Sequence, residues 1–303
     1  VVACLVAGMV HRGCAELGLS LFCRQLGGHF QVNSREALCA KLLHCVYQKT
    51  ANSSQHTQEA AESLAREMGA SYYEVSVQEY VDQMITTFQQ TCHKQLNWAK
   101  DSITLQNIQA RMRSPFPWMI ANAFSGILLC TANRSEAAVG YMTTDGDMSG
   151  GLAPIAGIDK SFLLSWLAWV AGGALAELKL LPALKKVLAL PPKAELVPLS
   201  YHQTDEGDLM PYDVLSVLEK LLICDKRGYE STRNELYRRF QNIPNNILND
   251  YLTKFQKMWQ KSQWKRERLP VGFHVDQMNV DPRSWCRYPV LTGDAQGQRL
   301  SIK

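Results

Sequence analysis

Two residues in the segment TANRSE have types and a spacing that suit chemistry on a nucleotide. Thr131 and Glu136 lie five residues apart, directly after an apolar run that ends at Cys130. A hydroxyl and a carboxylate on one strand-to-helix turn can meet a nucleotide and a Mg²⁺ ion from a single loop. A structural alternative stays open, in which Thr131 or Ser135 caps the next helix and Glu136 lies in its first turn.

A second polar segment, NIQARMR at residues 107–113, places an amide and a guanidinium on one helix face. Asn107 and Arg111 are four residues apart and therefore neighbours on a helix, whereas Arg113 points to another side. Such a pair suits recognition of a carboxylate or a phosphate. The same spacing is typical of a solvated polar face, so the spacing alone leaves both interpretations open.

Two basic segments offer further cations. Lys160, in the segment GIDKS, lies directly before a long apolar helix, where it could donate to phosphate oxygens or be an ordinary surface lysine. The segment KRER at residues 265–268 follows Trp264 and contains one acid among its four residues. It is too short to indicate nucleic-acid binding, and a solvated helix end is the default interpretation.

The composition is that of an ordinary globular protein. The chain has 303 residues, of which 46% are hydrophobic and 20% charged, which excludes a disordered or fibrous protein. Its formal net charge is +4, from 32 basic and 28 acidic residues. This weak positive balance does not indicate a nucleic-acid partner, and it suits an enzyme that handles phosphates equally well.

The cysteines and the apolar segments predict a cytoplasmic protein without a membrane span. The nine cysteines are odd in number and form no CxxC pair, which favours reduced, mostly buried thiols and no zinc site. The longest apolar run, residues 162–176, is shorter than the roughly 20 residues that cross a bilayer. It therefore predicts a buried helix.

Periodicity and turn residues predict alternating strands and helices. Helices are expected at residues 1–27, 55–68, 104–124, 162–176, 212–224 and 229–259, and strands at 41–47, 71–77 and 126–131. This alternation predicts an α/β fold with a parallel sheet and helices on both faces. Ligands bind such sheets beyond the carboxyl ends of the strands, where the polar segments 50–57 and 131–151 lie.

Taken together, four segments resemble NAD synthetase in order and spacing. They are NIQARMR, CTANRSEAAVGYMTTDGDMSGGLAPIAGIDKS, PPKAELVPLSYHQTDEGDLMPYDVL and QWKRERLPVGFHVDQMNVDPRSWCRYPVL. The particular likeness is to the synthetase (ATP-pyrophosphatase) domain of the bacterial glutamine-dependent type. The resemblance implies a flavodoxin-like, adenine nucleotide α-hydrolase-like fold. It leads us to expect the synthetase domain at residues 1–260 and an extended basic and aromatic tail at residues 261–303 that packs on it.

The resemblance implies an ATP-dependent amidation of deamido-NAD to NAD. The nicotinate carboxylate is adenylated with release of pyrophosphate, and ammonia, free or derived from glutamine, then displaces AMP. Mg²⁺ is the expected cofactor, with ATP and deamido-NAD as substrates. The expected partners are a glutaminase domain upstream and further copies of the chain in a homodimer or larger oligomer.

Site residues also follow from the resemblance, position by position. Glu136 and Lys160 match catalytic residues of the family, and Glu136 also matches a Mg²⁺ ligand. The positions that match ATP contacts are Ser53, Thr131 and Lys160, and Ser53 lies in a turn with Ser54 and Thr57 that resembles the family's Ser-rich turn near adenosine. The positions that match deamido-NAD contacts are Asn107, Arg111, Arg113, Glu136, Tyr141, Asp147 and Lys265.

Two departures from the family pattern qualify this picture. The family's phosphate loop, Ser-Gly-Gly-x-Asp-Ser, occurs nowhere in the sequence, and its expected place is just before Val1. We therefore expect an N-terminally truncated domain that lacks its first strand and phosphate loop. Lys193 stands where the family usually has Thr or Ser near the triphosphate. This lysine could supply charge to a phosphate, or the loop could be arranged differently.

Two other functions remain as alternatives. A catalytically incomplete fragment would act only as a dinucleotide-binding or oligomerisation module. A related ATP-pyrophosphatase would act on another carboxylate or carbonyl, although the segments 107–113 and 140–151 argue against it.

Overall fold

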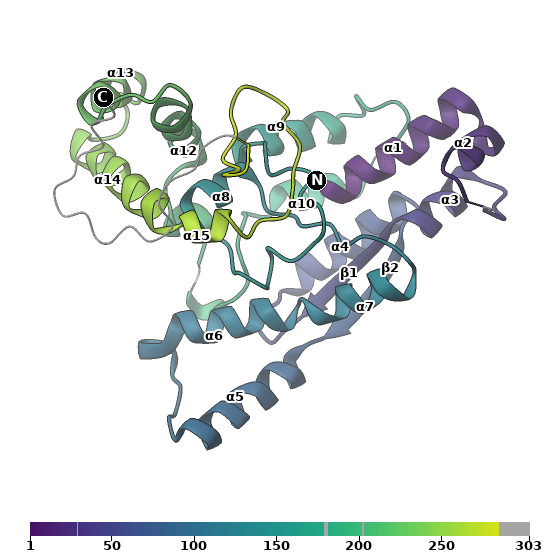
Figure 1. Ribbon diagram of the computed structural model, residues 1–303, viewed down its shortest axis with the longest axis horizontal. Helices are drawn as coiled ribbons and strands as arrows, with labels where there is room; N and C mark the ends of the chain where they lie inside the picture. The colour runs from purple at the N-terminus through teal and green to yellow at the C-terminus, as the bar shows by residue number, and fades with distance from the viewer. Residues whose placement is uncertain (29, 179–180, 202, 285–303) are drawn as a thin grey trace. The chain divides into compact units, whose positions relative to one another are not determined.

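The computed structural model describes residues 1–28, 30–178, 181–201 and 203–284 (Figure 1). The chain divides into two units. The first comprises residues 1–126 and 163–203, and the second comprises residues 127–162 and 204–303. Each unit contains some of the predicted site residues.

The first unit contains two parallel strands joined through a helix. Strand β1 (His44–Lys49) pairs with β2 (Ser71–Ser76), so that His44 lies opposite Ser71 and Lys49 opposite Ser76. Helix α4 (Gln55–Glu67) forms the crossover that a parallel pair requires. The parallel sheet with alternating helices was predicted, and the structure confirms it.

The predicted start of the first strand is wrong by three residues. Lys41 and Leu42 belong to helix α3 (Arg35–Leu42), which begins after Ser34, whose hydroxyl accepts a hydrogen bond from the Ala37 N–H. Because this cap starts a helix, the residues just before His44 form the end of that helix. Local β propensity alone does not predict this.

Helices around the sheet bury the core of the first unit. They are α1 (Val2–Leu17), α2 (Leu19–Gln25) and α10 (Pro182–Ala189), with the C-terminal part of α9 (Lys160–Ala171). The helix predicted over residues 1–27 is interrupted at Gly18, whose φ of 74° is left-handed. Among the described cysteines most are buried and all are free, and burial raises the pKa of Cys39 to about 11.

The remaining helices of the first unit follow β2. They are α5 (Gln78–Cys92), α6 (Trp98–Met112) and α7 (Pro115–Ala123), and the 3₁₀-helix η1 (Leu199–Tyr201) lies later in the chain. The single helix predicted over residues 104–124 is therefore wrong. An Asn97 cap starts α6 earlier, and Pro115 begins a separate helix because proline cannot continue the hydrogen-bond ladder of the preceding one.

The strand predicted over residues 126–131 is also wrong. Leu129 makes only an isolated parallel bridge to Leu152. The backbone beside Leu129 does not continue as a strand, because a glycine-rich bend with Gly150 at a φ of 154° precedes Leu152 and a turn at residues 154–157 follows Ala153. A β-branched or apolar run becomes a strand only where a partner continues beside it.

The second unit consists of short helices and extended loops. Its helices are α8 (Arg134–Val139), α11 (Asp205–Asp208), α12 (Tyr212–Leu218), the π-helix η2 (Glu219–Cys224), α13 (Tyr229–Arg239), α14 (Asn245–Lys261) and α15 (Gln263–Arg266). Helix α9 begins in this unit. Leu215, Leu218 and Leu248 are fully buried in its core. Pro244 divides the helix predicted over residues 229–259 into α13 and α14.

Within the described residues, no single helix is both long and apolar enough to cross a membrane. The pair α1 and α2, bent by 118°, meets the length and composition criteria when the two helices are taken together.

Candidate active site

Glu136 is built into the start of helix α8. The Asn133 side chain accepts a hydrogen bond from the Glu136 N–H at 3.0 Å, and the Asn133 N–H donates to Glu136 Oε2 at 3.1 Å. This reciprocal pair is a capping box. The structural alternative named Thr131 or Ser135 as the cap of this helix. The cap is instead Asn133. Thr131 lies exposed in the chain before this cap.

Lys160 lies beside Glu136 at the start of helix α9. The Lys160 N–H donates to Ser135 Oγ at 3.1 Å, and its Nζ lies 3.1 Å from Glu136 Oε1. The side chain of Lys160 is 20% exposed and that of Glu136 is 21% exposed. The structure thus brings these two predicted residues into an ion pair that still faces solvent.

A tyrosine and a carboxylate surround the lysine on another side. Lys160 Nζ lies 5.8 Å from the centre of the Tyr212 ring, and the Tyr212 hydroxyl donates to Asp205 Oδ2 at 3.0 Å. Burial raises the pKa of Asp205, and the Lys160 charge opposes that effect. Sequence reasoning missed Tyr212 and Asp205 as site residues. The signal was the segment PPKAELVPLSYHQTDEGDLMPYDVL, which resembles the family and contains both residues.

Tyr141 follows α8 directly and also bonds a carboxylate. Helix α8 ends at Gly140, which has a φ of 68°, and the Tyr141 hydroxyl donates to Asp208 Oδ2 at 2.7 Å. Burial, and then the hydrogen bond to Asp208, raises the pKa of Tyr141 above its usual value. The phenol is therefore a neutral hydrogen-bond donor.

Lys265 holds the loop that follows α8. Its Nζ donates to the carbonyl oxygens of Gly140 at 2.7 Å and Met142 at 2.6 Å. Residues 142–151 form a loop, as predicted, and the exposed Asp147 accepts a hydrogen bond from the Thr143 N–H at 2.7 Å. The Lys265 ammonium and the Asp147 carboxylate thus both contact the backbone of this loop.

The segment KRER is not a solvated helix end, which was the default interpretation. Arg266 is 1% exposed and donates to the Ala138 carbonyl at 2.9 Å and the Trp259 carbonyl at 2.7 Å. Its guanidinium lies 3.7 Å from the centre of the Trp259 ring. The arginine can be buried because its guanidinium N–H groups donate to protein oxygens and the face of the guanidinium lies over an aromatic ring.

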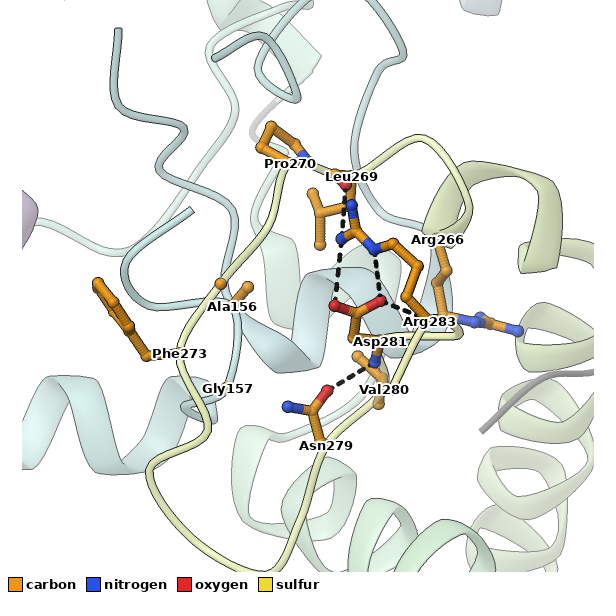
Figure 2. A pocket seen from close by; sticks show the side chains of 11 residues that line it. Ala156, Gly157, Arg266, Leu269, Pro270, Phe273, Asn279, Val280, Asp281 and Arg283 are labelled. Carbon is orange, nitrogen blue, oxygen red and sulfur yellow. Dashed lines mark hydrogen bonds and ion pairs between the residues drawn. The ribbon is translucent and has the colours of Figure 1, made fainter. Parts of the chain in front are cut away.

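A small cavity lies near Arg266 in the second unit (Figure 2). Its volume is about 10 Å³, which is room for about one water molecule. Arg283 lies at its edge and donates to Asp281 Oδ1 at 2.8 Å and to the Leu269 carbonyl at 3.0 Å. The cavity is too small for a nucleotide.

The other predicted residues lie in the first unit, around the turn before α4. Ser54 caps α4 by accepting from the Thr57 N–H at 3.3 Å, and Ser53 Oγ accepts from the Thr50 N–H at 3.1 Å. Arg113 Nη2 donates to Thr50 Oγ1 at 3.4 Å. The end of α6 and the Ser-rich turn are therefore adjacent. Asn107 is half-buried and Arg111 exposed on α6.

Glu195 joins the loop that contains Lys193 to the Ser-rich turn. Its carboxylate accepts from Ser54 Oγ at 3.0 Å and from Thr57 Oγ1 at 3.1 Å, and Lys193 Nζ lies 3.4 Å away. The next residue, Leu196, accepts from Gln109 of α6 at 2.8 Å. The lysine that departs from the family pattern thus lies beside the turn expected near adenosine.

The parallel strands joined through α4 make this an α/β protein. The NAD synthase family model matches residues 32–269. The chain therefore belongs to the NAD synthase family, and the predicted family and fold are confirmed.

Individual relatives support this assignment. The chain is 30% identical over 238 residues to the glutamine-dependent NAD(+) synthetase of Aquifex aeolicus, with 78% of this chain and 38% of the relative covered. It is 28% identical to the Bos taurus enzyme of the same name, with 95% and 44% covered. The chain thus spans less than half the length of these curated relatives.

Two solved structures resemble the chain. A glutamine-dependent NAD(+) synthetase from Cytophaga hutchinsonii matches with a TM-score of 0.81 and 37% identity, covering 96% of this chain and 48% of that one. The NMN synthetase of Francisella tularensis shares the fold, with a TM-score of 0.50, 17% identity and 84% of each chain covered.

Proposed function

We propose that this chain supplies the synthetase part of an enzyme that converts deamido-NAD into NAD at the expense of ATP. The observation that carries the proposal is the Glu136–Lys160 contact of 3.1 Å at the starts of two helices. Family membership supports it. The nicotinate carboxylate attacks the α-phosphorus of ATP and pyrophosphate leaves. Ammonia then attacks the acyl adenylate, and AMP leaves as the amide forms and a proton is released.

Lys160 and Glu136 have complementary tasks in this scheme. The Lys160 ammonium is a half-buried cation that can neutralise the phosphates of ATP as negative charge develops on the leaving pyrophosphate. Tyr212 and Asp205 fix the other side of the lysine. Holding the carboxylate and the α-phosphorus in line is the main task of such a site, because both reactants are anions.

Glu136 also suits the expected Mg²⁺ ion. Among the described residues, no three His, Cys, Asp or Glu side chains are grouped so that they could hold a metal ion. Mg²⁺ usually takes one or two protein carboxylates and completes its coordination with substrate phosphates and water. One carboxylate, that of Glu136, fits this requirement. When bound, the metal would polarise the phosphates and neutralise their charge.

Several of the predicted residues are suited to recognise deamido-NAD. Arg111 and Arg113 provide guanidinium groups and Asn107 an amide, which are suited to the phosphates and carboxylate of this dinucleotide. In the second unit, Tyr141 offers a neutral phenol and the loop beginning at Met142 carries Asp147. Lys265 fixes the start of this loop. Thr131 and Ser53 would contact ATP.

The nitrogen source and the partners belong to the same proposal. The relatives are named glutamine-dependent enzymes, and the chain spans less than half their length. We propose that a glutaminase domain supplies ammonia and that the enzyme is a homo-oligomer. A dinucleotide-binding module without turnover is the second candidate, because the sequence contains no Ser-Gly-Gly-x-Asp-Ser phosphate loop.

The test is AMP release from ATP, Mg²⁺, deamido-NAD and an ammonium salt. We expect AMP release that requires deamido-NAD and that falls about 100-fold in Lys160→Met, because the phosphates lose a charged donor. Lys185→Met, at an exposed position of α10, is the matched control and should behave as wild type. Binding of deamido-NAD without AMP release would favour the second candidate.

A further inference from the structure

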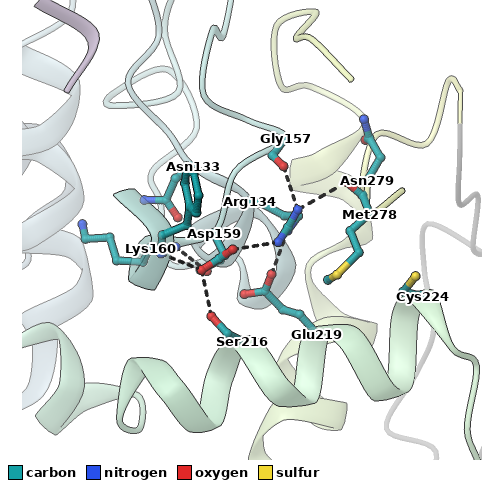
Figure 3. A network of polar contacts seen from close by, with 12 residues as sticks. Asn133, Arg134, Gly157, Asp159, Lys160, Ser216, Glu219, Cys224, Met278 and Asn279 are labelled. Atoms are coloured by element: carbon teal, nitrogen blue, oxygen red, sulfur yellow. Dashed lines mark hydrogen bonds and ion pairs between the residues drawn. The ribbon is translucent and has the colours of Figure 1, made fainter. Parts of the chain in front are cut away.

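Arg134 is a buried cation surrounded by carboxylates, next to the proposed site but not part of it (Figure 3). Only 3% of the residue is exposed. Nε donates to Glu219 Oε2 at 3.0 Å, Nη2 to Asp159 Oδ2 at 3.0 Å and Nη1 to Asp276 Oδ2 at 3.1 Å. Nη1 also donates to the Gly157 carbonyl at 2.7 Å.

A buried cluster of this kind does more than add stability. Removing Arg134 and Glu219 from water carries a large desolvation cost, and the charge attraction often only offsets it. What the cluster does provide is defined geometry. Its acids come from three separate segments, which are the start of α9, the π-helix η2 and the chain near Asp276. Arg134 therefore fixes the positions of three segments relative to α8.

The contact between Arg134 and Asp159 lies next to the proposed catalytic residues Glu136 and Lys160. Asp159 caps α9, since its Oδ1 accepts from the Phe162 N–H at 2.9 Å, and Lys160 is the next residue. Ser216 also donates to Asp159, at 3.0 Å. Arg134 itself lies two residues before Glu136 on α8. The Arg134–Asp159 ion pair thus joins the starts of the two helices that carry Lys160 and Glu136.

We propose that Arg134 is a positioning residue that acts through Asp159 to set the distance between Glu136 and Lys160. This inference rests on the function proposed above. Arg134 touches neither reactant, since its guanidinium is buried and its donors are directed at protein oxygens. A lysine in its place would keep the charge but could not reach three carboxylates at once, because it lacks the planar fork of donors.

The kinetic test compares Arg134→Met, Arg134→Lys and wild type for AMP release, with kcat and the KM for ATP measured separately. We expect kcat to fall about 100-fold in Arg134→Met, because a small misplacement of reacting groups has effects of this size. Arg134→Lys should recover at least a tenth of the lost activity. Arg238→Met, an exposed arginine of α13, is the control. Unchanged kcat and KM in a folded Arg134→Met protein would overturn the inference.

A second variant covers the case in which Arg134→Met does not fold. Asp159→Asn retains the helix cap, because Asn caps as well as Asp, but it loses the ion pair to Arg134. We expect kcat to fall about tenfold with little change in melting temperature. A folded Asp159→Asn protein with wild-type kcat would contradict the inference.

A third readout does not depend on turnover. The rate at which an amine-acylating reagent modifies Lys160, followed by mass spectrometry, reports how well Glu136 protects the lysine. We expect faster modification in Asp159→Asn than in wild type, and equal rates would overturn the inference. If wild type itself releases no AMP, the proposed function fails, while this labelling comparison still decides the positioning role.

Discussion

The Glu136 carboxylate takes part in two interactions at once. One oxygen accepts the N–H of Asn133 in the capping box, and the other faces Lys160. From the sequence, the helix-start role and the chemical role of Glu136 were alternatives. In the structure they are compatible, because a carboxylate has two oxygens and the cap uses one of them.

This dual role allows the two functions of Glu136 to be separated. Gln at this position of a capping box also accepts the N-cap N–H, so Glu136→Gln should leave the melting temperature nearly unchanged. It removes the charge that faces Lys160, and we expect AMP release to fall about 100-fold. Melting curves and AMP assays on one preparation provide the check. A large loss of stability with retained activity would show that the residue is only structural.

Glu219 predicts a pH dependence of stability. Burial raises its pKa from the usual 4.5 to about 7, so the folded protein holds a proton that the unfolded chain has released. Between about pH 4.5 and pH 7 the free energy of unfolding should therefore fall as the pH rises. Glu219→Gln should flatten this slope, and Glu230→Gln, an exposed acid of α13, should not. Denaturant unfolding at several pH values measures it, and identical slopes in wild type and Glu219→Gln would contradict the assignment.

At the scale of elements, helix and strand types were predicted better than their ends. The second strand and helix α4 lie where the sequence pattern placed them, whereas α5 (Gln78–Cys92) was not predicted. Interruptions at Gly18, Pro115 and Pro244 divided helices that periodicity alone had joined. The strand expected near Leu129 failed for a non-local reason, since among the described residues Leu129 makes one isolated bridge, to Leu152, and no longer ladder. A local sequence pattern does not indicate whether a second strand is available for pairing.

Gly140 is an element boundary that we expect to tolerate no side chain. It ends α8 with a φ of 68°, and an added Cβ would lie 2.1 Å from Ser262 Oγ. Gly140→Ala should lower the free energy of unfolding by about 1–3 kcal/mol through backbone strain and this clash. Gly228→Ala, where φ is −69° and no atom lies within 4 Å, is the matched control. Equal melting temperatures for the two variants would refute the expectation.

A further prediction of stability concerns Glu195 in the first unit. Glu195→Ala removes the acceptor for Ser54 and Thr57, and we expect a loss of about 1–3 kcal/mol in the free energy of unfolding. Glu59→Ala, at an exposed acid of helix α4, should change it by less than about 0.5 kcal/mol. Denaturant unfolding distinguishes the two. A loss confined to Glu59→Ala would contradict the structural role of Glu195.

At the scale of the whole molecule, the candidate site was identified by resemblance more than by spacing. The spacing of Thr131 and Glu136, or of Asn107 and Arg111, was equally compatible with capping and with a solvated face. The contact between Glu136 and Lys160 could not be derived from their spacing, because they lie 24 residues apart in different helices. Tyr212 and Asp205 were missed for the same reason, since only the tertiary fold brings them to Lys160.

We propose above that the enzyme whose synthetase part this chain supplies joins ammonia to deamido-NAD by way of an adenylate. The most direct measurement quantifies AMP and NAD formed in one reaction of the chain with ATP, Mg²⁺, deamido-NAD and an ammonium salt. We expect equal amounts of AMP and NAD, and neither product in the absence of deamido-NAD. Formation of ADP in place of AMP, or AMP release that is independent of deamido-NAD, would contradict it.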